Sequence, residues 1–146
     1  MKMEKDNRQS GFTLIEILIA ILLLIIGILG VGVMQNTSIE GNNTANNLTA
    51  AATWGSDALE TLMARSYTHD DLTDDNNDGM AGLDNTNAAG SPADGGPIVQ
   101  GNFTTFWNIA DNYPVFATKT IRVIVLRRDE GRIKAVNIDF IKTEPI

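Results

Sequence analysis

Cysteine is absent from the sequence, and histidine occurs once, at position 69. Without cysteine the chain has no disulfide framework, no thiol nucleophile and no thiolate metal site. A single histidine leaves little material for the Ser–His and Cys–His pairs that activate nucleophiles. Acidic side chains lie close together in the sequence, but no second base accompanies them, so we expect the protein not to be an enzyme.

Basic residues are missing from the middle of the sequence, since no Lys or Arg lies between Arg65 and Lys119. The formal net charge is −7, whereas nucleic-acid phosphates are bound by clustered Lys and Arg. We therefore expect no nucleic-acid partner. The acidic residues of this stretch predict a solvated, self-repelling surface or, alternatively, a cation site; they are Asp70, Asp71, Asp74, Asp75, Asp78, Asp84, Asp94 and Asp111.

Charged residues are also absent from positions 17–34, where almost every side chain is apolar. The whole apolar segment, residues 12–34, is long enough to span a bilayer as a helix, which takes roughly 20 residues. Lys2, Lys5 and Arg8 precede it, and basic flanking residues favour the cytoplasmic side. The pattern predicts a single membrane span with a cytoplasmic N-terminus.

Two ordinary interpretations of this segment compete. A cleaved secretory signal has an apolar stretch of roughly 7–15 residues followed by a small-residue cleavage site, and this segment is longer and lacks that site. A plain membrane anchor agrees with the length and the flanking charge but does not explain Glu16. An acidic residue within a membrane segment is costly and is by default functional, although Glu16 lies near enough to the polar leader to reach the interface.

The residues around Glu16 supply a third interpretation. Gly11-Phe12-Thr13-Leu14-Ile15-Glu16 resembles the type IV prepilin processing signal, which follows a polar leader like residues 1–11. The resemblance implies that a prepilin peptidase cleaves between Gly11 and Phe12 and that Phe12 is then N-methylated. It also implies that Glu16 pairs with a terminal amine, commonly that of a neighbouring subunit during assembly. Such a pair agrees with elementary electrostatics, because an unpaired buried ammonium group is strongly unfavourable.

Residues 35–67 predict a continuation of the helix beyond the membrane segment. Asn is abundant in the first part and is a poor helix former, but the second part carries an apolar stripe at three- and four-residue spacing. The stripe consists of Ala52, Leu59, Leu62, Met63 and Tyr67. We expect this amphipathic half of the helix to pack on the protein's own sheet.

Residues 68–102 have turn chemistry throughout and no periodicity, so they predict a long acidic loop. Within it, Asp74-x-Asn76-x-Asp78-Gly79 fits the opening of a calcium loop, with Gly79 at the sharp turn. The candidate calcium ligands are Asp74, Asn76, Asp78, the carbonyl of Met80, and Asp84. Asn85 stands where a calcium loop of this kind closes with Glu, so a solvated turn rich in Asp and Asn is the alternative.

The C-terminal segment, residues 103–146, predicts an antiparallel sheet. Aromatic and β-branched residues at 103–109 and alternating residues at 119–127 and 132–142 are typical of strands, and Gly131 suits a short hairpin loop. One face of these strands can cover the helix stripe. The fold class is therefore α+β: a long N-terminal helix, with a membrane-spanning first half, packed by its second half on a small antiparallel sheet.

The order of these segments is similar to that of the PilV-type minor pilins, the type IV pilus modification proteins. The resemblance implies the pilin fold, a minor pilin function in initiating or modifying a type IV pilus, and a path from the inner membrane to an extracellular filament. It implies four partners: the prepilin peptidase and methylase, other pilins, other minor pilins and an inner-membrane assembly platform. A pseudopilin of a type II secretion system and a membrane-anchored extracytoplasmic binding module are the alternatives.

Overall fold

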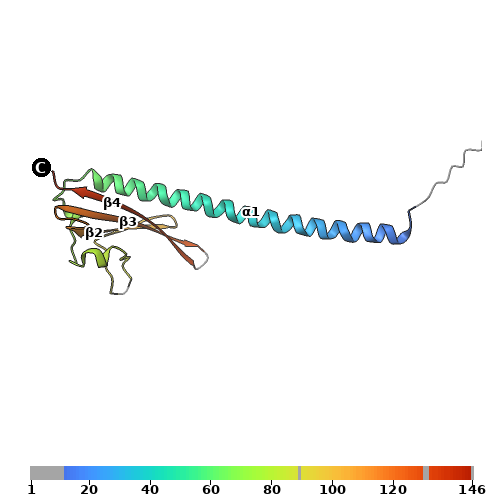
Figure 1. Cartoon of the computed structure of the whole chain (residues 1–146). Coiled ribbons are helices and arrows are strands. Elements are labelled where there is room, and N and C mark those ends of the chain that lie inside the picture. Colours follow the sequence, from blue (N-terminus) through green and yellow to red (C-terminus); the bar gives the residue numbers. More distant parts are fainter. Residues whose placement is uncertain (1–11, 89, 130–131, 146) are drawn as a thin grey trace, which may run out of the picture. The chain divides into compact units, whose positions relative to one another are not determined.

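The computed structural model describes residues 12–88, 90–129 and 132–145. Its elements are α1 (Leu14–Met63), two short 3₁₀ helices, η1 (Asp70–Leu72) and η2 (Gly79–Gly82), and four strands (Figure 1). The strands are β1 (Gly95–Gln100), β2 (Phe103–Asp111), β3 (Thr118–Asp129) and β4 (Arg132–Thr143). The predicted α+β class is confirmed. By its internal contacts the chain divides into a helix unit that ends at Thr44 and a sheet unit that begins at Ala45.

Helix α1 begins where a capping signal places its start. The Thr13 carbonyl accepts hydrogen bonds from the backbone N–H groups of Glu16 (3.1 Å) and Ile17 (3.3 Å). The Asn- and Thr-rich middle is helical in the structure, and its Thr37 Oγ1 donates to the Val33 carbonyl at 3.1 Å without breaking the helix. Helix formation therefore overrides the weak propensity of this segment.

The helix ends at Met63, four residues short of the predicted end at residue 67. Lys142, a residue of β4, bonds to the carbonyls at this end of the helix. Lys142 Nζ donates a hydrogen bond to the Met63 carbonyl at 2.9 Å and another to the Arg65 carbonyl. A cation bonded to the last carbonyls both caps them and complements the negative end of the helix dipole.

The sheet unit is built on four antiparallel strands in the order β1-β2-β3-β4. Trp107, Val123 and Ile138 are in register across the three longer strands, and they face the last turns of α1. Leu59 and Leu62 of the predicted stripe lie in or against this core, as expected, whereas Met63 is 40% exposed. Burying a Leu or Val side chain contributes about 1.5–3 kcal/mol, so this face accounts for much of the unit's stability.

Gly55 allows the close approach between α1 and the sheet. A Cβ atom at this position would lie 2.8 Å from Ile138 Cδ1 and 3.2 Å from Val125 Cγ2. A larger side chain would therefore push the helix off the strands.

The acidic segment, residues 68–102, packs on both sides of the sheet: Leu72 belongs to the core beside α1, and the part around Leu83 and Asp94 lies on the opposite face. Asn108 is buried, its Nδ2 donates to the carbonyls of Leu83 (3.0 Å) and Asn85 (2.9 Å), and its Oδ1 accepts from Asp94 N–H (3.2 Å). A buried amide with all these partners satisfied holds an irregular segment in one position. The segment is thus folded onto β2 rather than extended into solvent.

The sheet has one strand more than the three predicted. Strand β1 lies inside the range 68–102 that was expected to be loop, so that boundary was wrong at its C-terminal end. Ile98, Val99 and Gln100 pair with Thr105, Thr104 and Phe103 around a turn in which Gly101 has φ +59°. The strand escaped prediction because Gly and Pro fill half of it, and both residues weaken a strand pattern.

Candidate functional site

The N-terminal end of α1 brings together two of the three residues predicted for processing and assembly. Phe12 and Glu16 line the same groove on the helix surface, of about 540 Å³, with Ile17, Ala20, Ile21 and Leu24. Gly11 and the rest of the leader lie outside the described residues. Phe12 is 79% exposed, so the first residue of the expected mature chain and the carboxylate are presented on one face.

Glu16 also has a local role that the sequence interpretation missed. Its backbone N–H donates to Thr13 Oγ1 at 3.4 Å, and Thr13 precedes the first helical residue. Thr and Glu three residues apart form the capping-box pattern, and an acidic side chain in the first turn complements the helix dipole. The pattern Thr-x-x-Glu was visible in the sequence and could have fixed the helix start.

No described residue bonds to the Glu16 carboxylate itself. Capping therefore uses the backbone of Glu16 and leaves its charged group available. A carboxylate on an apolar surface needs a cationic or hydrogen-bonding partner once water is removed.

The rest of the helix unit presents an apolar surface that no other part of the described chain covers. The large hydrophobic side chains from Phe12 to Ile39 are each between 48% and 79% exposed. Among the described residues, one helix, α1, is long and apolar enough to cross a membrane. Contiguous apolar surface of this extent marks a contact with lipid or protein.

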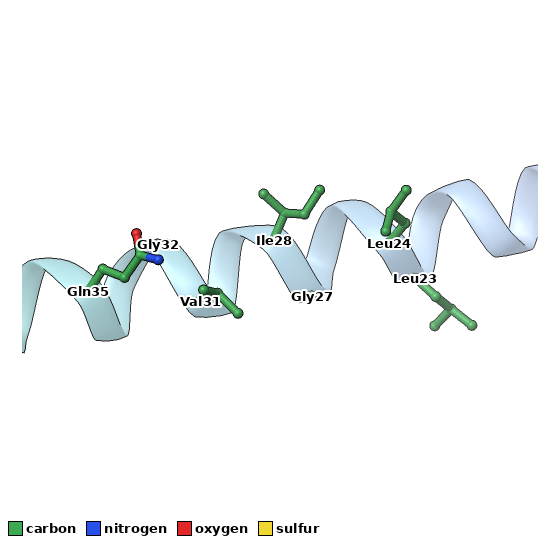
Figure 2. Close-up of a pocket in the computed structure, with 7 residues that line it drawn as sticks. All are labelled: Leu23, Leu24, Gly27, Ile28, Val31, Gly32 and Gln35. Carbon is green, nitrogen blue, oxygen red and sulfur yellow. The ribbon is translucent and has the colours of Figure 1, made fainter.

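Glycines leave a groove between the larger side chains of this surface. Figure 2 shows bare ribbon at Gly27 and Gly32 among the side chains that line a groove of about 550 Å³. Nothing lies within 4 Å of a Cβ atom built at either glycine. The helix unit itself therefore does not require glycine at these positions.

Residues 6–32 match the family described as the prokaryotic N-terminal methylation motif. The chain carries this methylation motif. The matched residues include Gly11, Phe12 and Glu16 and extend into α1, so the match supports a type IV pilin-like prepilin. No curated protein and no solved structure matches the chain.

The methylation motif indicates a pilin-like or pseudopilin substrate of a prepilin peptidase. It covers the leader and the apolar part of the helix and says nothing of the sheet unit. The acidic segment, where the sequence suggested a second site, has to be judged from its geometry.

Three of the candidate calcium ligands lie around one tight turn. The two carboxylate oxygens of Asp74 accept from the N–H groups of Asp78 (3.1 Å) and Gly79 (2.9 Å), and Asn76 Oδ1 also accepts from Asp78 N–H (3.1 Å). Gly79 has φ +55°, which agrees with the sharp turn predicted there. The turn is thus closed by its own side chains.

The other two candidates are directed elsewhere. Asp84 Oδ1 accepts from Arg122 at 2.7 Å, and the same guanidinium binds both carboxylate oxygens of Asp139. The Met80 carbonyl accepts from Leu83 N–H at 3.5 Å, and its side chain is exposed. Arg122 therefore ties the end of η2 to β4 and removes Asp84 from the turn.

One oxygen of the Asp78 carboxylate also has a partner within the chain. Its Oδ2 accepts from Asn85 Nδ2 at 2.6 Å, and its carboxylate lies where a Cβ atom on Gly82 would stand. Among the described residues, no three His, Asp or Glu side chains are grouped to hold a metal ion. Calcium binding stays a prediction. Asp78 Oδ1 is buried and has no hydrogen-bond partner among the described residues, whereas Asp84 would have to leave Arg122.

Asp94 is the residue of this segment that the sequence interpretation did not single out. Its Oδ2 accepts from Ile109 N–H at 2.7 Å, and its buried Oδ1 has no hydrogen-bond partner. The pKa of Asp94 is raised from 3.8 to about 6, chiefly by burial and also by the nearby Asp74 and Asp78, while the backbone hydrogen bonds from Ile109 and Asp75 lower it. The folded chain therefore favours protonated Asp94, although the hydrogen bond from Ile109 N–H by itself favours the carboxylate.

This anchor predicts a pH dependence of stability. The pKa of Asp94 is higher in the folded chain than the ordinary 3.8, so between about pH 4 and 6 the folded state binds more protons. Its contribution should be fully present below pH 4 and should be lost as the pH rises through 6. Thermal midpoints measured across this range should therefore show wild type losing stability relative to Asp94→Asn.

Asp57→Asn is the matched control, because Asp57 is an exposed aspartate on α1. If the difference between wild type and Asp94→Asn stays constant from pH 4 to 7, the proposed protonated anchor is wrong.

Proposed function

We propose that this chain is a minor pilin of a type IV pilus, a structural subunit that initiates or modifies the filament. Its leader, residues 1–11, is removed by a prepilin peptidase, and Phe12 becomes the methylated N-terminus. Before assembly, residues 12–34 hold the chain in the inner membrane with the leader in the cytoplasm. After assembly, the same helix surface is covered by other pilin subunits.

One observation carries the proposal: the methylation motif runs directly into an apolar helix whose large side chains are about half exposed or more among the described residues. A soluble protein would bury such a surface. A plain membrane anchor would need the apolar surface but not the motif. A subunit that passes from lipid to a helical filament needs both.

The arrangement of Phe12 and Glu16 supports a role in subunit register. Cleavage before Phe12 creates an ammonium group beside the groove that also contains the Glu16 carboxylate. At 4 Å two opposite charges interact with about 4 kcal/mol at an effective dielectric constant of 20. A carboxylate that pairs with the amine of the next subunit favours one axial position over its neighbours.

The resemblance to PilV-type proteins supports the pilus over the secretion filament. The order of helix, acidic segment and sheet agrees with it, and the partners it suggests are other pilins, the peptidase and an inner-membrane assembly platform. A type II pseudopilin would share the motif and the apolar helix, so these two features serve both filaments.

Replacing Glu16 tests the assembly role. Glu16→Ala should leave cleavage after Gly11 intact but lower the amount of the chain in sheared filaments by at least about tenfold, because leaving one partner of a buried pair unpaired costs several kcal/mol. Immunoblots of filament and membrane fractions measure both quantities.

Glu40→Ala is the matched control, since Glu40 is an exposed acid on the same helix that bonds with Asn36. Normal incorporation of Glu16→Ala would contradict the pairing, and loss of both variants would point to a general defect of the helix.

Calcium binding at the acidic segment is a separate part of the proposal. Asp78 would supply its unpartnered Oδ1, and Asp74 and Asn76 would supply side-chain oxygens that now accept from the N–H groups of the turn. Calorimetric titration of the whole chain in detergent should then show saturable heat that Asp78→Ala abolishes and Asp57→Ala does not. If no heat appears at millimolar calcium, the turn closed by its own side chains is the complete account.

A further inference from the structure

The sheet unit carries a solvent-exposed cleft between α1 and the turn that joins β1 to β2. The helix lines it with Asn47 and Trp54, the turn with Gln100 and Asn102, and β3 with Arg127. All of these residues belong to the sheet unit. The cleft has a volume of about 510 Å³, which lies within the range of about 300–1,000 Å³ that is usual for small-molecule sites.

An indole ring forms the apolar part of the cleft. Trp54 is 37% exposed, although it is one of the largest apolar side chains in the chain. The next residue, Gly55, is buried against Ile138 and Val125, so the backbone that carries the indole is held against the sheet. A fixed and partly exposed indole offers a flat surface on which a ring of a ligand can stack.

Amide side chains form the polar part. Asn47, Gln100 and Asn102 each carry a group that both donates and accepts hydrogen bonds. The turn that holds two of them is tied to the sheet, because the Asn102 carbonyl accepts from Arg128 N–H at 3.4 Å. Gly101, between them, has no side chain to obstruct a ligand. Groups that donate and accept together suit a ligand with several hydroxyl groups, since a hydroxyl also does both.

Arg127 gives the cleft a positive charge. Its guanidinium carbon lies 5.9 Å from the centroid of the Phe103 ring, which also lines the cleft. Stacking of this kind orients the planar guanidinium group. An oriented guanidinium binds a carboxylate through two parallel hydrogen bonds, which gives geometric specificity as well as affinity.

A second cation stands beside Arg127. Lys134 of β4 is directly opposite Arg127 in the sheet, and its side chain is exposed. Like charges directly opposite each other are destabilising, so an anion held near both relieves their repulsion. Among the described residues that line the cleft none is acidic, whereas the chain as a whole has a formal charge of −7. The cleft therefore favours a ligand with a negative charge.

The lining as a whole narrows the class of ligand. A purely apolar ligand would leave the amides and the guanidinium without partners, which is costly. A metal ion would find no carboxylate among the described lining residues. A ligand that combines a ring, several hydroxyl groups and a carboxylate matches all three parts of the cleft.

We propose that this cleft binds an acidic saccharide. A sugar ring lies on the Trp54 indole, its carboxylate pairs with Arg127, and its hydroxyl groups bond with the amides of Gln100 and Asn102. This activity goes beyond the role in a filament and does not rest on it, because every residue involved lies in the sheet unit.

Titration of the full-length chain in detergent with trigalacturonate, a trimer of uronic acid, tests the proposal by calorimetry. Binding should be saturable, and neutral galactotriose should bind at least about tenfold more weakly, because it lacks the hydrogen bonds to a charged group. Citrate and adenosine monophosphate, which are anions without the saccharide, should bind more weakly than trigalacturonate.

Arg127→Gln should lower the affinity for trigalacturonate at least about tenfold, and Arg127→Lys, which keeps the charge but not the paired hydrogen bonds, should restore part of it. Arg128→Gln is the matched control, since successive side chains of a strand point to opposite faces and Arg128 is exposed. It should bind like the wild type. Gln100→Ala, at an exposed position that cannot disturb the core, should lower the affinity several-fold.

Tryptophan fluorescence gives a second readout, because the chain has only two tryptophans. Trp107 packs against the core, and its Nε1 donates to the Asp71 carbonyl at 3.1 Å. Trigalacturonate should therefore change the emission of Trp54 alone, and Trp54→Phe should abolish the change. A change of the same size in Trp54→Phe would show that the ligand does not lie on this indole.

Three other results would each overturn the proposal: no binding at millimolar trigalacturonate, equal affinity for galactotriose, citrate or adenosine monophosphate, or an equal loss in Arg127→Gln and Arg128→Gln. Thermal midpoints of all variants show whether they are folded. If Arg127→Gln is unfolded, Gln100→Ala decides, and unchanged affinity in that variant would contradict the site.

Discussion

The apolar side chains of α1 between Phe12 and Ile39 impose the constraint on which the rest of the protein depends. Each is about half exposed or more in the isolated chain, and burying one such side chain contributes about 1.5–3 kcal/mol. Exposure of this helix to water is therefore strongly unfavourable. Lipid before assembly and neighbouring helices afterwards both satisfy it, and a processing motif at its first residues fits a protein that exchanges one for the other.

The sheet unit buries its core with its own residues, whether the helix unit lies in lipid or among other helices. The last turns of α1 pack on Trp107, Val123 and Ile138, with Gly55 permitting close approach. Asn108, Asp94 and Arg122 then fasten the acidic segment to the opposite face. The helix thus covers one face of the sheet and the acidic segment covers part of the other, whereas β1 and the turn at Tyr113–Phe116 stay exposed.

Sequence patterns predicted the features that depend on local periodicity. The apolar segment at 12–34, the stripe containing Leu59 and Leu62, and the three longer strands follow directly from the spacing of side chains. Strand β1 could not be predicted this way, because Gly95, Gly96 and Pro97 suppress the pattern and its pairing depends on β2.

The candidate sites differ in the same way, since some depend on local spacing and others on contacts between distant residues. Phe12 and Glu16 are four residues apart, so the helix expected from residue 12 places them on one face. In the structure α1 begins at Leu14, and the two residues still line one groove. The partners of Asp84 and Asp94 are far along the chain, at Arg122 and Ile109. Only the fold could show that Asp84 is withdrawn from the calcium-like turn and that Asp94 is anchored to β2.

Under the proposed function, this chain becomes a filament subunit when it loses its leader and exposes Phe12 as a new N-terminus. Mass spectrometry of the N-terminal peptide, taken from the chain in a host with a prepilin peptidase, measures this directly. The account predicts that the first residue is N-methylated Phe12. An intact Met1 in that host would contradict it.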